Sequence, residues 1–107
     1  MRKYLNEVTP ETETAKVIGW VHEIRDLGGL SFYILRDRTG FLQATIVKKK
    51  APEAVLNAAK DVSRESVVMV SGIVKPTEKA PGGRELICRE IAGRHISRAF
   101  QAHLDKH

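Results

Sequence analysis

The sequence has little that would support disulfide, metal or membrane chemistry. Its single cysteine, Cys88, excludes an internal disulfide and any site built from several cysteines. No apolar run approaches the roughly 20 residues of a membrane-spanning helix. The first residues lack the apolar core and small-residue cleavage site of a signal peptide. We therefore expect a cytoplasmic protein with no metal, no cofactor and no membrane partner.

Residues that could carry catalysis are also scarce. Cys88 falls in a predicted strand, where a free cysteine is typically a buried structural thiol. Acidic residues at turns and strand ends do not form an acid/base pair, and the C-terminal histidines are too scattered for a ligand set. These residues are Glu23, Asp26, Asp37, His95, His103 and His107. The chain alone is not expected to be an enzyme.

Composition places the chain among ordinary globular domains with a basic surface. Its 107 residues suffice for one domain, with 42% hydrophobic and 29% charged residues. The formal net charge is +5 and the isoelectric point is about 9.6. A basic balance favours acidic partners, of which nucleic acid is the commonest. A net positive charge also increases solubility, so charge alone does not identify the binding partner.

Hydrophobic periodicity predicts five strands and one helix. The strands are expected over residues 16–25, 30–37, 41–47, 65–75 and 84–96, the last bulged near Gly93. Helical spacing over residues 51–62, with Pro52 in the first turn, predicts a helix of about three turns. Residues 1–14 are polar and predict an arm with a turn near Thr9-Pro10. Residues 99–107 predict a tail with a further short helix.

This order of elements, β-β-β-α-β-β, predicts an all-β domain with one helix: the five-stranded OB-fold barrel, over residues 15–98. An SH3-type barrel is the alternative, but a ten-residue helix between the third and fourth strands argues against it. An OB barrel binds ligands on the face of its second and third strands, between the first and last hairpin loops. Here those loops are "RDLGG" and "PTEKAPGG".

Strand alternation sorts side chains into a core face and a mixed face. In the second and third strands we expect the inward-pointing residues to be Tyr33, Leu35, Leu42, Ala44 and Ile46. In the first strand one face is expected to carry Val17, Gly19 and Val21, and the other face Ile18, Trp20, His22 and Ile24. The mixed face then carries Trp20, His22, Phe32, Arg36, Phe41 and Gln43. Exposed rings that stack on bases, an amide that reads base edges and cations that pair with phosphate are typical of single-strand binders.

The stretch "GWVHEIRDLGG-LSFYILRDRTGFLQATI", with "SRESVVMVSGIV" and "GGREL", resembles the anticodon-binding OB domain of class IIb aminoacyl-tRNA synthetases. The aspartyl-tRNA synthetases of archaeal type are the most similar. The resemblance covers residues 16–99 and implies a module that binds the anticodon loop of aspartate tRNA.

The resemblance also implies roles for matching positions. Phe32 would stack on the central anticodon base, a uridine, and Gln43 would read it. Arg25 would contact the anticodon loop and Glu85 the anticodon. Gly28 and Gly29 would let the RNA backbone approach, and Trp20 would support the wall of the site.

Two further positions bear on specificity. Enzymes of this type that charge only aspartate tRNA tend to have Trp at the position of His22 and Lys at that of Pro81. His22 and Pro81 therefore resemble the non-discriminating enzymes, which also accept asparagine tRNA.

The chain departs from the family at its end. The hinge prolines and the catalytic domain are absent, which indicates an excised or engineered domain or a free-standing paralogue. Two other functions stay open: a general single-stranded nucleic-acid-binding protein, and a protein-interaction or engineered binding module. A tail helix bearing Phe100 and Leu104 would support a homodimer.

Overall fold

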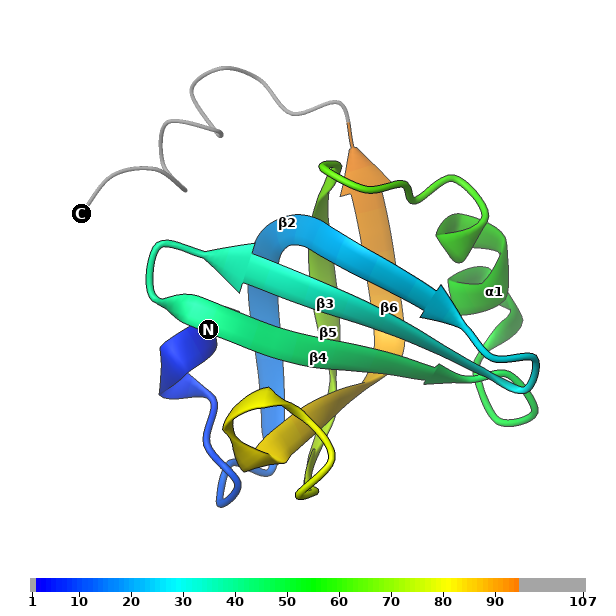
Figure 1. Ribbon diagram of the computed structural model, residues 1–107. Coiled ribbons are helices and arrows are strands. Elements are labelled where there is room, and N and C mark those ends of the chain that lie inside the picture. The colour runs from blue at the N-terminus through cyan, green and yellow to red at the C-terminus, as the bar shows by residue number, and fades with distance from the viewer. Residues whose placement is uncertain (1, 95–107) are drawn as a thin grey trace.

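The computed structural model describes residues 2–94 of the chain (Figure 1). Six strands, one α-helix and two short 3-10 helices follow one another along these residues. They are β1 (Arg2–Lys3), η1 (Leu5–Glu7), β2 (Thr14–Asp26), β3 (Leu30–Asp37), β4 (Gly40–Val47), α1 (Glu53–Ala59), β5 (Val67–Pro76), η2 (Pro81–Gly83) and β6 (Arg84–Arg94). No helix among them is long and apolar enough to span a membrane.

The sheet closes into a five-stranded barrel because β2 pairs with both β3 and β5. The strand order is β1-β2-β3-β4-β6-β5, with an additional pairing of β2 and β5. The first half of β2 pairs with β5 up to Trp20, and the second half pairs with β3 from Trp20 onward. Figure 1 shows β2 bending between the two. The predicted OB-fold barrel with its β-β-β-α-β-β order is confirmed, and β1 is a short addition.

The helix is shorter than the sequence pattern predicts. It runs over Glu53–Ala59, about two turns, and then tightens, since the N–H of Lys60 donates to the carbonyl oxygen of Asn57. Val55 is buried in the barrel core, and the helix packs against β6. The expectation of three turns is therefore wrong by one turn.

The core faces of β3 and β4 are the predicted ones. Tyr33 and Leu35 point inward, as do Leu42, Ala44 and Ile46, which are at most 1% exposed. Cys88 is also in the core, where burial raises the pKa of its thiol to about 12 from an ordinary 9.0. Cys88 is thus the buried structural thiol that the sequence indicates.

Two bulges differ from the expected strand patterns. In β2 the pairing with β3 shifts between Val21 and Glu23, so His22 is the extra residue. Because one extra residue reverses the alternation, Ile24 turns into the core and not onto the mixed face. In β6 the extra residue is Arg89, since Ser71 pairs with Glu90 and Gly72 with Cys88. The predicted bulge near Gly93 is therefore misplaced.

The N-terminal segment packs against the barrel. Leu5 and Val8 are almost completely buried in the main core. The N–H of Leu5 donates to Asp37 Oδ2 over 2.9 Å, and that of Asn6 donates to Thr39 Oγ1 over 3.1 Å. The predicted turn is present, with the N–H of Thr12 donating to the Thr9 carbonyl oxygen. The predicted tail helix, with Phe100 and Leu104, lies outside the described residues.

Candidate nucleic-acid interface

The outward face of β2, β3, β4 and β6 is a grid of side chains fixed by strand register. In one row Arg25 pairs with Phe32, Phe32 with Thr45, and Thr45 with Ile87. In the next row Glu23 pairs with Ile34, Ile34 with Gln43, and Gln43 with Glu85. Directly paired residues have Cβ atoms roughly 5 Å apart. The ring of Phe32 and the amide of Gln43 therefore occupy adjacent rows of one surface.

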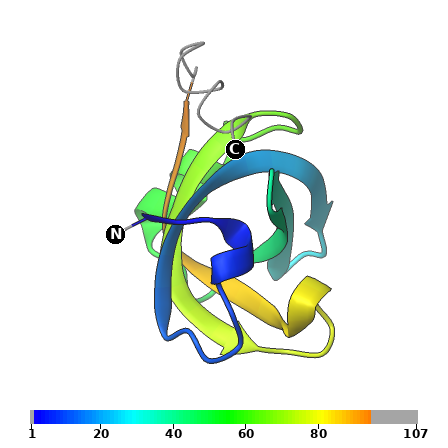
Figure 2. The ribbon, with the colours of Figure 1, turned by 90° about the vertical axis from the view of Figure 1, so that its left-hand side faces the viewer.

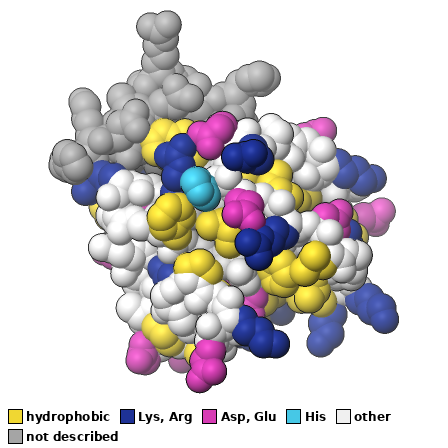
Figure 3. All heavy atoms as spheres, viewed as in Figure 1, with side chains coloured by type: hydrophobic (Ala, Val, Ile, Leu, Met, Phe, Trp, Pro, Cys, Tyr) yellow, Lys and Arg dark blue, Asp and Glu magenta, His cyan; other side chains and the backbone are white. Residues whose placement is uncertain are grey.

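This surface forms the floor of a groove that the hairpin loops flank. The β2–β3 loop contributes Leu27, and the β5–β6 loop contributes Thr77, Lys79 and Pro81. We call this hollow the recognition groove. Figure 3 looks onto this side of the molecule, where apolar side chains lie among charged ones of both signs. The remaining lining residues are Glu23, Arg25, Leu30, Phe32, Ile34, Phe41, Gln43, Thr45, Val47, Glu85 and Ile87.

Three polar side chains on the floor are hydrogen-bonded to one another. Thr45, 3% exposed, donates its hydroxyl to Glu85 Oε1 over 2.5 Å. Gln43 Nε2 lies 3.4 Å from Thr45 Oγ1 and 3.5 Å from Glu85 Oε1. One amide hydrogen of Gln43 therefore faces the protein. The other hydrogen and the amide oxygen are available to a ligand.

The charges of the recognition groove balance. Its lining holds two cations, Arg25 and Lys79, and two carboxylates, Glu23 and Glu85. Arg25 and Glu23 form an ion pair, and the guanidinium lowers the pKa of the Glu23 carboxyl through this hydrogen bond and its charge. At the loop end, Lys48 pairs with Asp26 over 2.9 Å. The groove is thus neutral overall and suited to bases rather than to a run of phosphates.

Pro81 lines the groove, whereas His22 adjoins it. Pro81 is among the lining residues, on the β5–β6 loop. The bulge exposes His22, and its ring meets that of Phe41 edge-on with the centroids 5.2 Å apart. Phe41 lines the groove and is 45% exposed. His22 therefore borders the groove through Phe41.

Trp20 and Arg36 lie outside the groove lining. Trp20 packs on Ile18 and Val67 in a small separate cluster. The Arg36 guanidinium lies 5.0 Å from the Trp20 ring centroid and donates to Glu65 Oε1 over 2.7 Å. Trp20 and Arg36 therefore contact each other outside the groove lining, and the charge of Arg36 is already paired with that of Glu65.

Of the two glycines in the β2–β3 loop, only Gly28 has a backbone conformation that favours glycine. Gly28 has a φ of +76°, a conformation that favours glycine. Gly29 has an ordinary backbone, and its carbonyl oxygen accepts a hydrogen bond from the Lys48 N–H. Space is open around both Cα atoms, so the loop backbone is accessible.

The family model described as an OB-fold nucleic acid binding domain, named for the tRNA anticodon, matches residues 15–92. The match covers most of the chain, including every strand of the barrel. The chain belongs to this family. Its barrel is accordingly a nucleic-acid-binding OB domain of the anticodon type.

Curated relatives of this OB domain are archaeal ligases. The Aspartate--tRNA(Asp/Asn) ligase of Methanoculleus marisnigri is 62% identical over 91 residues, which are 85% of this chain and 21% of the ligase. That of Archaeoglobus fulgidus is 52% identical over 93 residues. The chain spans about a fifth of the length of the relatives it matches. These 107 residues thus correspond to the anticodon-binding OB domain and do not include the catalytic domain.

Solved structures share the fold over nearly the whole domain. The asparaginyl-tRNA synthetase of Pyrococcus horikoshii, complexed with asparaginyl-adenylate, superposes with a TM-score of 0.80 and 35% identity over 94% of this chain and 24% of its own. An OBody bound to hen egg-white lysozyme superposes with a TM-score of 0.79 and 26% identity, over 89% of this chain and 95% of its own.

The sequence does not predict the roles of two residues that organise this OB domain. Thr45 is one polar residue among several in an alternating strand, and its hydrogen bond to Glu85 becomes evident only from the pairing of β4 with β6. Arg84 reads as a surface charge at a strand start, yet it is 6% exposed. Its guanidinium donates to the carbonyl oxygens of Leu5, Val8 and Pro81, each over 2.7 Å. No local signal in the sequence distinguishes either residue from its exposed neighbours.

Proposed function

We propose that this OB domain binds the anticodon loop of aspartate tRNA and of asparagine tRNA, as the recognition module of a cytoplasmic Asp/Asn-type ligase. One observation carries the proposal. On the floor of a charge-neutral groove, the aromatic ring of Phe32 lies in the row next to Gln43, whose amide has one hydrogen facing the protein and its other polar atoms free. The relatives named Aspartate--tRNA(Asp/Asn) ligase support the choice of tRNA.

In this proposal the central anticodon base stacks on Phe32. Stacking of a base on an aromatic side chain contributes about 1–3 kcal/mol. The free N–H and the amide oxygen of Gln43 then meet the edge of uracil, which offers a carbonyl oxygen and an N–H side by side. Cytosine presents the reverse order, a ring nitrogen acceptor beside an amino donor, so an amide held in one orientation by Thr45 and Glu85 does not match it.

Fluorescence-anisotropy titration of the 107-residue chain tests the function. The ligands are anticodon stem-loops bearing GUC, GUU and a triplet with a different central base, each at two salt concentrations. We expect GUC and GUU to bind more tightly than the third triplet. Equal binding set only by salt would identify a general single-strand binder, and no binding would favour a protein-interaction module.

Thr45→Val is expected to lower the preference for uridine over cytidine at the central position about tenfold, without unfolding the barrel. Valine has nearly the shape of threonine but cannot hold Glu85, and through it Gln43, in place. A hydrogen bond to a charged group contributes about 1.5–3 kcal/mol, and 1.4 kcal/mol corresponds to tenfold. The measurement is the ratio of the two stem-loop dissociation constants.

Two variants separate this positioning role from a structural one. Thr45→Ser keeps the hydroxyl and should restore the ratio. Thr77→Val removes a hydroxyl from the same groove outside the hydrogen-bonded trio and should leave the ratio unchanged. An equal loss of affinity for both stem-loops in Thr45→Val would contradict a role in discrimination.

The double variant His22→Trp/Pro81→Lys is expected to shift the preference toward GUC over GUU by about fivefold or more, the ratio that about 1 kcal/mol produces. Tryptophan at position 22 would extend the boundary beside Phe41, and lysine at position 81 would add a cation to the groove lining. The same anisotropy titration measures the ratio. Ala54→Lys, which adds a cation at an exposed site on α1, should not change it. An unchanged ratio in the double variant would rule out these positions as determinants.

A further inference from the structure

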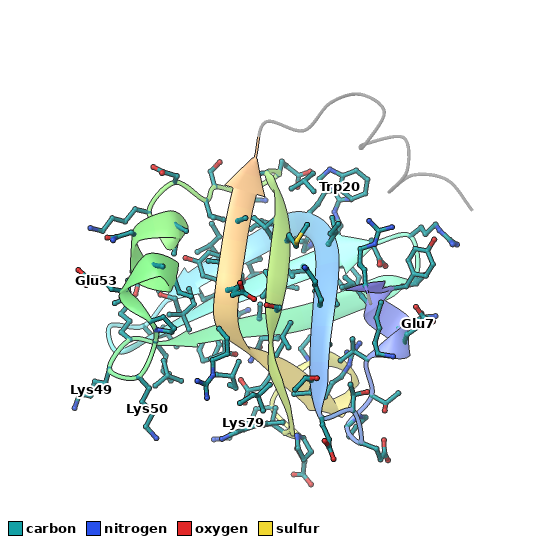
Figure 4. The ribbon with its side chains drawn as sticks, turned by 180° about the vertical axis from the view of Figure 1, so that it is seen from behind. Glu7, Trp20, Lys49, Lys50, Glu53 and Lys79 are labelled. Atoms are coloured by element: carbon teal, nitrogen blue, oxygen red, sulfur yellow. The ribbon has the colours of Figure 1, made fainter. Side chains whose placement is uncertain are left out.

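Several cations of the described residues lie outside the recognition groove and form no ion pair. On the groove side, ion pairs neutralise Arg25, Arg36 and Lys48, and Lys79 forms none. Beyond the groove, two adjoining hollows share Ile73 and Arg89, and the second hollow meets the groove at Val47 and Ile87. Between them they are lined by five cations: Lys3, Lys16, Lys50, Lys75 and Arg89. We call this surface, over β2, β5 and β6, the rear face (Figure 4).

The rear-face cations form no ion pairs. This holds for all five within residues 2–94, and neither hollow has an acidic residue in its lining. Two carboxylates flank the cations: Glu90, which accepts a hydrogen bond from Ser71, and Glu85, which pairs with Lys75 in the β5–β6 register. Unpaired cations on one face attract polyanions from solution, with a range set by the ionic strength.

The bulge in β6 shapes this surface. Arg89 is the extra residue of the bulge, and its side chain lines both hollows. Opposite it, Gly72 lies so close to β6 that an added Cβ would be 1.8 Å from the Ile87 carbonyl oxygen. The absence of a side chain at Gly72 lets the β6 backbone come this close at the bulge that carries Arg89. Bulges that redirect a side chain in this way are typical of functional positions.

We propose that the rear face binds the phosphodiester backbone of RNA, independently of base sequence and of the groove. The rear face offers ammonium and guanidinium groups with the hydroxyl of Thr14, all of which bind phosphate, and among residues 2–94 no aromatic ring lines either hollow. The groove, by contrast, has stacking and base-edge groups with balanced charge. The domain thus has two separate contacts: one that reads bases and one that holds backbone.

A double variant, Lys16→Ala/Arg89→Ala, tests the rear face on an RNA duplex of roughly 16 base pairs, a length that dedicated duplex-binding domains cover. A blunt duplex has no unpaired base for Phe32, so it reports on backbone binding alone. Each phosphate neutralised contributes about 0.7–0.9 to the slope of log affinity against log salt concentration. The variant should therefore reduce the slope by about 1.5. Between about 50 and 200 mM salt, the wild-type chain would lose about eightfold more affinity than the variant.

The matched control is Lys60→Ala/Arg64→Ala, which removes the same two charges from exposed positions in the connection between α1 and β5. It should keep the wild-type slope. An equal change in both double variants would show that only net charge matters, and absence of duplex binding by the wild-type chain would overturn the proposal outright.

This inference shares with the proposed function only the premise that the ligand is RNA. The ratio of affinities for the GUC stem-loop and the unrelated stem-loop should be the same in Lys16→Ala/Arg89→Ala as in the wild-type chain. A change in that ratio would contradict the independence of the two contacts. Failure of the wild-type chain to discriminate triplets would overturn anticodon reading and leave the duplex result standing.

Discussion

Phe32→Ala should weaken binding of the GUC stem-loop by about five- to 150-fold, the range that corresponds to about 1–3 kcal/mol of base stacking. The ring of Phe32 is half-buried on the groove floor between Arg25 and Thr45, so its outer face is the platform that the central base would occupy. Truncation removes this platform and leaves the barrel core intact, because the inward neighbours Tyr33 and Leu35 are untouched. Anisotropy titration at fixed salt measures the change.

The companion variant Gln43→Ala separates stacking from base reading. It should lower the preference for GUC over the triplet with another central base while keeping most of the sequence-independent affinity. Tyr4→Ala truncates an aromatic ring outside the groove lining and should leave both quantities unchanged. Wild-type affinity in Phe32→Ala, with an unaltered salt dependence, would remove base stacking from the proposed function.

The strands with regular alternation were predictable because one buried face repeats every second residue. Leu30–Asp37 has the predicted bounds, and β4 differs from prediction by one residue. The resemblance to synthetase domains indicated Glu85 and Pro81, which composition and periodicity alone did not suggest. Both line the groove together with Phe32, Gln43 and Arg25.

What the sequence could not show depends on contacts between distant segments. A bulge adds one residue without altering composition, so the reversed alternation after His22 is invisible until β3 is paired with β2. Leu5 and Val8 stand in a polar stretch with no period, yet both are buried by contacts with the barrel. The exclusion of Trp20 and Arg36 from the groove likewise follows from the position of Glu65 and Val67, far along the chain.

Arg84 occupies the point where the N-terminal segment meets the β5–β6 loop. Figure 2 shows η1 and η2 at the same end of the barrel, near the start of β6. The Arg84 guanidinium joins them by donating to Leu5, Val8 and Pro81 carbonyl oxygens. Burial lowers the pKa of the Arg84 guanidinium below its ordinary value, yet Arg84 remains charged at neutral pH because arginine is effectively always protonated.

Arg84→Ala is expected to lower the free energy of unfolding by about 3–5 kcal/mol. Each buried polar group left without its partner costs about 1–3 kcal/mol, and hydrogen bonds from a charged donor are at the strong end. The carbonyl oxygens of Val8 and Pro81 would lose their donor, whereas that of Leu5 would keep the Val8 N–H. Urea unfolding followed by circular dichroism measures the loss.

Arg84→Lys distinguishes the hydrogen-bond pattern from the charge. Lysine keeps the charge but lacks the planar fork that reaches three acceptors, so we expect most of the loss to persist. Arg64→Ala, at an exposed position, should change stability by no more than about 0.5 kcal/mol. A loss below about 1 kcal/mol in Arg84→Ala would contradict the role of Arg84 as a clamp. The Arg84 guanidinium also holds Pro81, which lines the groove, through its carbonyl oxygen. Loss of this hydrogen bond in Arg84→Lys should therefore weaken stem-loop binding under conditions where the barrel stays folded.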